Sequence, residues 1–325
     1  MNFIKKILCS ALALMTLVLP VLPVAAAATA QEARTYPLVL SVDGLRVSML
    51  NEQQKQVPAL FSNGSYYLPV RTAGEWLGKT VTWEGVSQTI ALSGANTPVF
   101  HDDNNATDFA FAYEYGKAVN VTARNDITIL MDGEKQAFFN AAGQRVYPIL
   151  YQGTTYLPLR NVAALLGKEI AWRNATADQA PQISVYTPMS KTEQTACAAY
   201  LEQMAALAEQ VTGAAAGLYP SKSDKAALSA LLAQMGDSLD EGQEVAVPDV
   251  PYLKFSSKTV TRAIADELAL LADAKSKLST QTADELFATA HGQASGILMQ
   301  VMTANRFSNA VSDLAKDYER VGLEQ

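Results

Sequence analysis

Residues 67–78 read YLPVRTAGEWLG, and residues 156–167 read YLPLRNVAALLG, 89 positions further along the chain. The agreement extends beyond this stretch, because nine of the twenty positions in 64–83 are identical in 153–172. An Asp-Gly pair recurs at the same offset, at 43–44 and 132–133. Chance does not produce agreement of this length, so the front half of the chain contains an internal repeat.

Each copy of the repeat contains signals for turns, a helix start and a helix stop. Asp43-Gly44 and Asn63-Gly64 favour two-residue hairpin turns, because both positions tolerate positive φ. Pro69 suits the start of a helix, where its missing N–H is not needed, and Gly78 suits the left-handed cap that ends it. The sequence therefore predicts that each copy is a small β-sheet crossed by one short helix. The expected buried face of the first helix consists of Val70, Ala73 and Leu77.

The residues of this pattern resemble a known family. The similarity is to the copper amine oxidase N-terminal domain, also called the stalk domain, and it rests on Asp43-Gly44, Asn63-Gly64, Tyr67-Leu68-Pro69-Val70-Arg71, Leu77-Gly78 and Trp83. It covers residues 37–93 and again 126–187, which implies two tandem stalk-type domains. Such copies are common in secreted proteins of Gram-positive bacteria, so the resemblance implies that kind of host. The second copy departs from the pattern where Gln152-Gly153 replaces Asn-Gly.

The resemblance implies the stalk alone, without the oxidase chemistry. In those oxidases, copper is held by three histidines beside a tyrosine-derived quinone, in a domain that resembles nothing in this chain. The chain has two histidines in all, His101 and His291. These are too few for that copper site. We therefore expect no cofactor, no metal and no amine oxidase activity.

Four residues of the repeats are candidate contact residues for a partner. They are Trp76, Tyr66, Arg71 and Arg160. Trp76 lies one position off the expected buried face of its helix, so an exposed Trp76 could contact a partner. Arg71 and Arg160 each place a cation in a first helical turn, against the helix macrodipole. Either the guanidinium ties the helix start to a neighbouring strand, which we favour, or it binds an anionic ligand.

Two further tryptophans, Trp83 and Trp172, are equivalent in the two copies. Both lie in predicted strands after the helix. We expect them to pack under the helix, and the alternative is that they form platforms on which sugars stack.

The chain changes in composition near residue 188. All three tryptophans precede this point, whereas 26 of the 137 residues after it are alanine. The apolar spacing after it is helical, and Thr282 with Glu285 forms a capping box that starts one helix. We therefore expect an α+β protein: a signal peptide at 1–30, two tandem small β-sheet units each with one short helix at 31–188, and an all-α helical bundle at 189–325. The expected helices centre on 197–211, 228–235, 260–278, 282–301 and 311–318, with a loop at 240–255.

The first thirty residues predict the compartment. Lys5 and Lys6 precede a largely apolar run, 7–24, that ends in small residues at 26–30. This pattern is typical of a secretory signal peptide, with cleavage expected near Gln31. The alternative is a retained N-terminal anchor, because the run is just long enough to span a membrane. After cleavage, we expect no further membrane span.

Charge and cysteine usage limit the partners of the remaining chain. Without residues 1–30 it has 23 basic and 32 acidic side chains, a net charge of −9. This balance argues against nucleic acid or an anionic membrane surface as a partner. Cys197 is the one cysteine beyond the signal segment. It can form no internal disulfide, so we expect a buried apolar role for it.

Three functions fit these features. The leading hypothesis is a secreted, non-enzymatic cell-envelope protein whose stalk repeats bind or space something in the wall while the bundle carries an interaction. The expected partner is a cell-wall polymer or another envelope protein, and the expected location is extracellular, at the cell wall. One alternative is an extracellular sensor of a ligand or peptide. The other is a wall hydrolase, which would need two carboxylates about 5–9.5 Å apart, and no nucleophile motif, phosphate loop or metal cluster in the sequence favours an enzyme.

Overall fold

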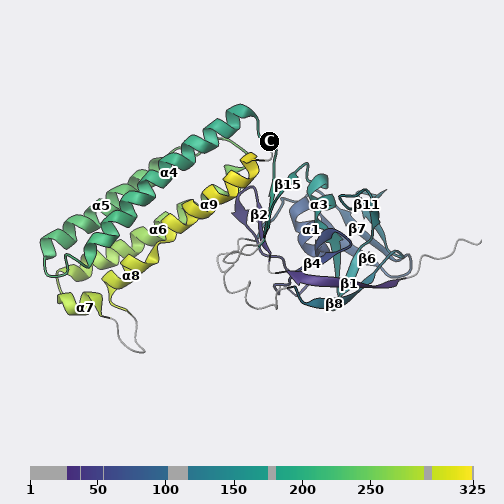
Figure 1. Cartoon of the computed structure of the whole chain (residues 1–325), viewed down its shortest axis with the longest axis horizontal. Helices are drawn as coiled ribbons and strands as arrows, with labels where there is room; N and C mark the ends of the chain where they lie inside the picture. Colours follow the sequence, from purple (N-terminus) through teal and green to yellow (C-terminus); the bar gives the residue numbers. More distant parts are fainter. Residues whose placement is uncertain are drawn as a thin grey trace, which may run out of the picture.

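The computed structural model describes residues 28–36, 38–53, 55–101, 116–174, 181–288 and 295–323. Strands dominate the front of the chain and helices the rear, so the expectation of an α+β protein is confirmed. Figure 1 shows a β part with two short helices, and a helical part that extends away from it. Most of the expected signal segment and His291 lie outside the described residues.

Six strands close into one barrel, in the order β1-β4-β5-β14-β13-β8. They are β1 (Thr29–Tyr36), β4 (Ala59–Ser62), β5 (Ser65–Pro69), β8 (Ala118–Ala123), β13 (Ile149–Tyr151) and β14 (Thr154–Pro158). β4 and β5 come from the first repeat and β13 and β14 from the second, while β1 and β8 directly precede the two repeats. The expectation of one small sheet per repeat is therefore wrong. The physical reason is that a separate three-stranded unit would expose both of its edges, whereas closure removes them.

Two four-stranded sheets also combine strands of both repeats. One has the order β15-β16-β2-β3 and the other β10-β9-β7-β6. Their strands are β2 (Val39–Val42), β3 (Leu45–Arg46), β6 (Thr80–Glu84), β7 (Thr89–Ser93), β9 (Thr128–Met131), β10 (Glu134–Lys135), β15 (Glu169–Arg173) and β16 (Gln182–Tyr186). β2 pairs in parallel with β16, and β9 with β7. Each repeat therefore contributes one hairpin to a sheet of the other. A short pair, β11 (Phe138–Phe139) with β12 (Arg145–Val146), completes the described strands.

The turns that the sequence predicts adopt the expected backbone. Asp43, Asn63 and Asp132 have φ of 46°, 46° and 48°, and a glycine with positive φ follows each of them. This is the hairpin turn that Asp-Gly and Asn-Gly pairs favour. Gln152 has φ of 47° and precedes Gly153 at 80°. The second copy thus keeps the same turn despite its glutamine.

A lysine of each repeat pairs with an aspartate of the other. Lys79 of the first copy contacts Asp132 of the second at 2.6 Å. Lys168 of the second copy contacts Asp43 of the first, and this pair is far more buried. Asp43 also accepts a hydrogen bond from the Thr187 backbone N–H at 2.7 Å. The repeated Asp-Gly and Gly-Lys pairs therefore hold the two copies together.

The short helices are α1 (Val70–Leu77) and α3 (Leu159–Leu165). Gly78 ends α1 with φ 63°, in the left-handed conformation that the sequence predicts. The buried residues of α1 are Val70, Thr72, Ala73, Gly74 and Trp76. Leu77 is half-buried, so the buried face of α1 is rotated from the expected one.

The rear of the chain folds into helices that pack on one another. They are α4 (Lys191–Leu218), α5 (Lys225–Glu244), α6 (Leu253–Leu278), α7 (Ala283–Phe287), α8 (Ile297–Ala304) and α9 (Arg306–Leu323). The capping box of Thr282 and Glu285 is present, but α7 ends at Phe287 instead of continuing to 301. The expected loop at 240–255 is shorter, because α5 reaches Glu244 and α6 starts at Leu253. Among the helices of the described residues, none is both long enough and apolar enough to cross a membrane.

The core of the helical part includes residues of the β part. Ala171 and Tyr186, on β15 and β16, belong to the same buried cluster as the helix residues Cys197, Tyr252 and Leu314. Figure 1 shows that the start of α4 and the end of α9 lie beside β2 and β15. The β part also has two buried clusters of its own, so the core of the helical part extends onto β15 and β16 without merging with them.

Candidate functional site

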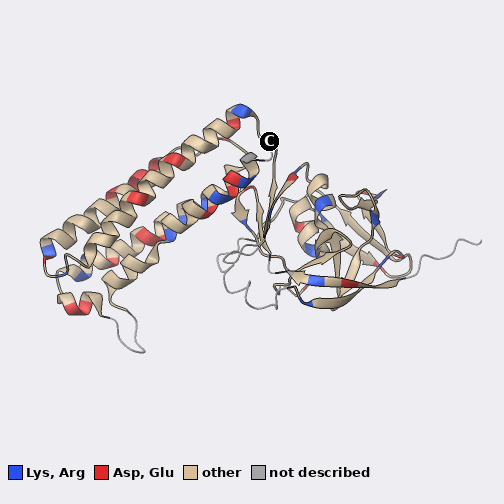
Figure 2. Cartoon of the chain, in the orientation of Figure 1, with Lys and Arg blue, Asp and Glu red and all other residues tan. Residues whose placement is uncertain are grey.

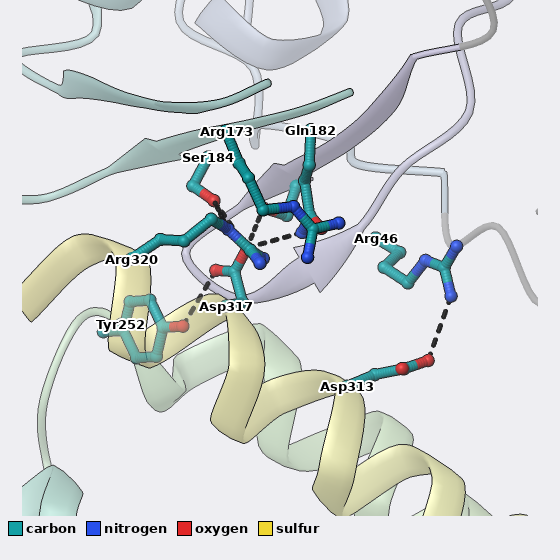
Figure 3. A network of polar contacts seen from close by, with 9 residues as sticks. Arg46, Arg173, Gln182, Ser184, Tyr252, Asp313, Asp317 and Arg320 are labelled. Atoms are coloured by element: carbon teal, nitrogen blue, oxygen red, sulfur yellow. Dashed lines mark hydrogen bonds and ion pairs between the residues drawn. The ribbon is translucent and has the colours of Figure 1, made fainter. Parts of the chain in front are cut away.

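A buried carboxylate, Asp317 on α9, lies at the centre of a polar network where the two parts meet (Figure 3). Its side chain is almost fully excluded from solvent, at 2% exposure. Its oxygens accept hydrogen bonds of 2.5–3.1 Å from Ser41, Gln182, Ser184 and Arg320 at Oδ1 and from Tyr252 at Oδ2. A buried carboxylate needs such partners, because its desolvation is costly. Asp317 therefore fastens α9 and the start of α6 to the sheet.

Strand alternation places the sheet residues of this network. Ser41 on β2 and Ser184 on β16 alternate with core residues, and the two strands pair in parallel at Ser41 and Ser184. Side chains of neighbouring strands in register lie on the same face. Both hydroxyls consequently point to α9. One helical turn separates Arg320 from Asp317, and their contact of 2.8 Å keeps the carboxylate paired inside its own helix.

The surroundings shift the proton equilibria at this interface. Burial, followed by the charge of Asp317, raises the pKa of Tyr252 well above its ordinary value. Tyr252 thus stays a hydrogen-bond donor. Burial, followed by the neighbouring Arg320, lowers the pKa of Arg173. Arg173 donates to Gln182 at 3.3 Å. These groups orient one another, and the arrangement acts as a fastening between the two parts.

Two further contacts tie the first repeat to the helices. Arg46 on β3 pairs with Asp313 on α9 at 2.9 Å (Figure 3). Gly44 lies so close to α9 that a Cβ there would be 2.5 Å from Leu314 Cδ1. At its equivalent in the second copy, Gly133, a Cβ would have no described atom within 4 Å. The same turn therefore has a second role in one copy only.

Trp76, which the sequence suggests as an exposed contact residue, is fully buried. The expectation of exposure is wrong because the segment after β7 returns along α1. The Val99 N–H donates to the Glu75 carbonyl at 2.9 Å, and the ring centroid of Phe100 lies 6.0 Å from that of Trp76. Phe100 in turn contacts Phe255 of α6 at 5.1 Å. Trp76 is thus part of the scaffold.

The two candidate arginines lie in different surroundings. Arg71 pairs with Glu75 in its own helix at 3.0 Å, and Glu75 also contacts His101 at 3.1 Å. The ion pair of Arg71 with Glu75 runs along α1. Arg160 is exposed on α3, and within the described part of the chain it makes no hydrogen bond or ion pair. The structure does not bring the two guanidinium groups to one acid.

Tyr66, the remaining candidate, belongs to a row of half-buried aromatic rings. Its ring centroid lies 4.8 Å from that of Phe61 and 4.9 Å from that of Trp172. The Trp172 indole N–H donates to Asn174 Oδ1 at 2.6 Å. Trp172 is therefore held on its face by Tyr66 and at its edge by Asn174.

Trp83, the equivalent of Trp172 in the first copy, is 52% exposed. The expectation that both tryptophans pack under a helix thus fails for Trp83. Within the described residues, Trp83 stacks on no aromatic ring, and its indole N–H donates no hydrogen bond. Sequence reasoning offers an exposed Trp83 only as the alternative, and the sequence difference that accompanies it is that the equivalent positions 66 and 155 are not the same residue.

The described residues contain no group of three or more histidine, cysteine and acidic side chains that could hold a metal ion. Comparisons with family models, with curated proteins and with solved structures found no match to this chain. The function must therefore be argued from the residues and contacts described above.

Proposed function

We propose that the chain is a secreted, non-enzymatic protein of the Gram-positive cell envelope, in which a duplicated stalk-type unit and a helical bundle form one rigid body. In this proposal the stalk unit contacts a cell-wall polymer, and the helical part presents an interaction away from it. The resemblance to the stalk family and the signal-like N-terminus support the location.

The observation that carries the proposal is that charged residues of the repeat motif form ion pairs within the protein itself. Lys79 with Asp132 and Lys168 with Asp43 join the copies, and Asp317 joins the helices to the sheet. A protein whose fixed charges hold its own parts in one arrangement suits a spacing or presenting role.

Attraction between opposite charges is a poor basis for contact between the stalk unit and a cell-wall polymer. Lys and Arg are interspersed with Asp and Glu along α9 (Figure 2), and the chain is acidic overall. We therefore expect contact through rings and hydrogen bonds, with little dependence on salt.

The test is co-sedimentation of intact residues 31–325 with isolated Gram-positive cell walls, at low and at high salt. An unrelated acidic protein of similar size serves as the control. We use the whole chain because the helical core contains Ala171 and Tyr186 of the β part. Retention at both salt concentrations, with the control left in solution, supports the proposal. A chain that stays in the supernatant contradicts it and favours the sensor alternative.

A further inference from the structure

Trp83 and Trp172 form an internal comparison, because they occupy the same position in the two repeats. Trp172 of the second copy is covered by Tyr66 of the first. The antiparallel pairing of the equivalent residues Leu68 and Leu157 relates the copies by a local two-fold axis, so the counterpart of Tyr66 on the Trp83 side belongs to the second copy. That position is Thr155, which pairs with Leu150 as Tyr66 pairs with Phe61.

Both partners that hold Trp172 are missing at Trp83. Thr155 stands where Tyr66 would be and carries no ring. Gly85 stands where Asn174 would be, and it has no side chain to accept the indole N–H. The result is an indole with an uncovered face and an unpaired donor within the described residues.

We propose that Trp83 is a binding site for one sugar ring of a neutral or N-acetylated glycan, which takes the place that Tyr66 occupies over Trp172. The choice of a glycan rests on the proposed function. A pyranose ring has about the size of a phenol ring, and its C–H face stacks on an indole while its hydroxyls bond at the rim.

The surroundings of Trp83 favour a sugar over a protein partner. Val86, at the turn that follows Trp83, is an apolar side chain that is 98% exposed. The turn after Trp83 is otherwise polar, since Ser87 donates to Glu84 at 2.8 Å. A protein interface needs a broader apolar patch. The acidic balance of the whole chain disfavours an anionic ligand, which is why the proposal names a neutral glycan.

The test is calorimetric titration of intact residues 31–325 with soluble oligosaccharides of N-acetylglucosamine and, separately, of glucose. We expect the unaltered protein to bind at one site. Trp83→Ala removes the stacking face, and we expect its affinity to fall about tenfold or more, the usual weight of one buried aromatic face. Thr155→Tyr keeps Trp83 but covers it with a ring, so we expect a similar loss.

Tyr66→Thr is the matched variant for Trp172, because it removes a covering ring where Thr155→Tyr adds one. It uncovers Trp172 while Asn174 remains, so we expect a second, weaker site. Thermal unfolding followed by circular dichroism checks that each variant is folded. Unchanged binding in both Trp83→Ala and Thr155→Tyr, or no binding of either oligosaccharide to the unaltered protein, overturns the proposal.

Sedimentation with cell walls separates this inference from the proposed function. If Trp83→Ala sediments and also binds the oligosaccharides as the unaltered protein does, the envelope function stands and the Trp83 site fails. If the oligosaccharides bind at Trp83 but the unaltered protein does not sediment, the site stands and the envelope function fails. Loss of sedimentation in Trp83→Ala and in Thr155→Tyr supports both.

Discussion

Leu68 and Leu157, the same position in the two repeats, lie directly opposite each other in the antiparallel strands β5 and β14. An antiparallel pairing of equivalent residues places a local two-fold axis between the copies. Barrel closure, hairpin exchange and the reciprocal Lys–Asp pairs all follow from this arrangement. The repeats consequently fold as one unit, and differences between equivalent positions show where the copies have separate roles.

Replacement of the buried carboxylate of the network should destabilise the whole chain. Asp317→Ala removes the ion-pair partner of Arg320 and the acceptor of the Tyr252 hydroxyl. We expect the free energy of unfolding to fall by about 3 kcal/mol or more, as when one partner of a buried ion pair is removed. Urea unfolding followed by circular dichroism measures this. Asp313→Ala, which breaks only the partly exposed pair with Arg46, should cost about 1 kcal/mol or less, and equal costs would contradict a central role for Asp317.

Gly44 and Gly133 provide a matched pair for the contact between the two parts. Both have positive φ, so an alanine at either position costs about 1–2 kcal/mol of backbone strain. At Gly44 the methyl group would also lie 2.5 Å from Leu314 Cδ1 and 3.1 Å from Ser256 Cβ. We expect Gly44→Ala to lower the melting temperature clearly more than Gly133→Ala does. Similar decreases in the two variants would show that α6 and α9 do not pack closely against the turn at Gly44.

The two reciprocal ion pairs between the copies should contribute unequally to the free energy of unfolding. Asp43 is buried and also accepts the Thr187 N–H, whereas Asp132 is half exposed. Asparagine tolerates the positive φ that both positions have, so the substitution tests the charge. We expect Asp43→Asn to reduce the free energy of unfolding by about 2–3 kcal/mol and Asp132→Asn by about 1 kcal/mol or less. Chemical denaturation measures the loss of stability in both variants. A larger loss for Asp132→Asn than for Asp43→Asn would contradict this expectation.

Cys197 should report opening of the contact between the two parts. It is fully buried near Met189, and burial raises the pKa of its thiol to about 11. The native thiol should therefore resist a thiol reagent at pH 8 and react in urea, since the thiolate is the reactive form. The raised pKa also means that its contribution to stability is complete below its ordinary pKa and is lost as the pH rises towards about 11. Fast reaction of the folded protein at pH 8 would contradict this burial.

Local features of this protein follow from its sequence, because neighbouring residues decide them. The Asp-Gly and Asn-Gly turns, the cap at Gly78 and the capping box at Thr282 are settled within a few residues of backbone. Composition likewise separates the β part from the helical part. These features were predicted from the sequence, and the structure contains them.

Features that depend on distant residues were not predictable in this way. The sequence shows the repeat but not the exchange of hairpins, which brings Lys168 to Asp43 across 125 positions. The network of Asp317 reaches Ser41 across 276 positions. Trp76 is buried because a later segment covers it, whereas Trp83 remains 52% exposed.

The sequence by itself therefore determined the repeat, its turns and helix ends, and the α+β class, since backbone preferences and side-chain periodicity act over short distances. The tertiary structure alone decided which strands pair and which aromatic rings are covered. The physical reason is that burial and pairing depend on which surfaces meet when the whole chain closes, and two equivalent positions can meet different partners.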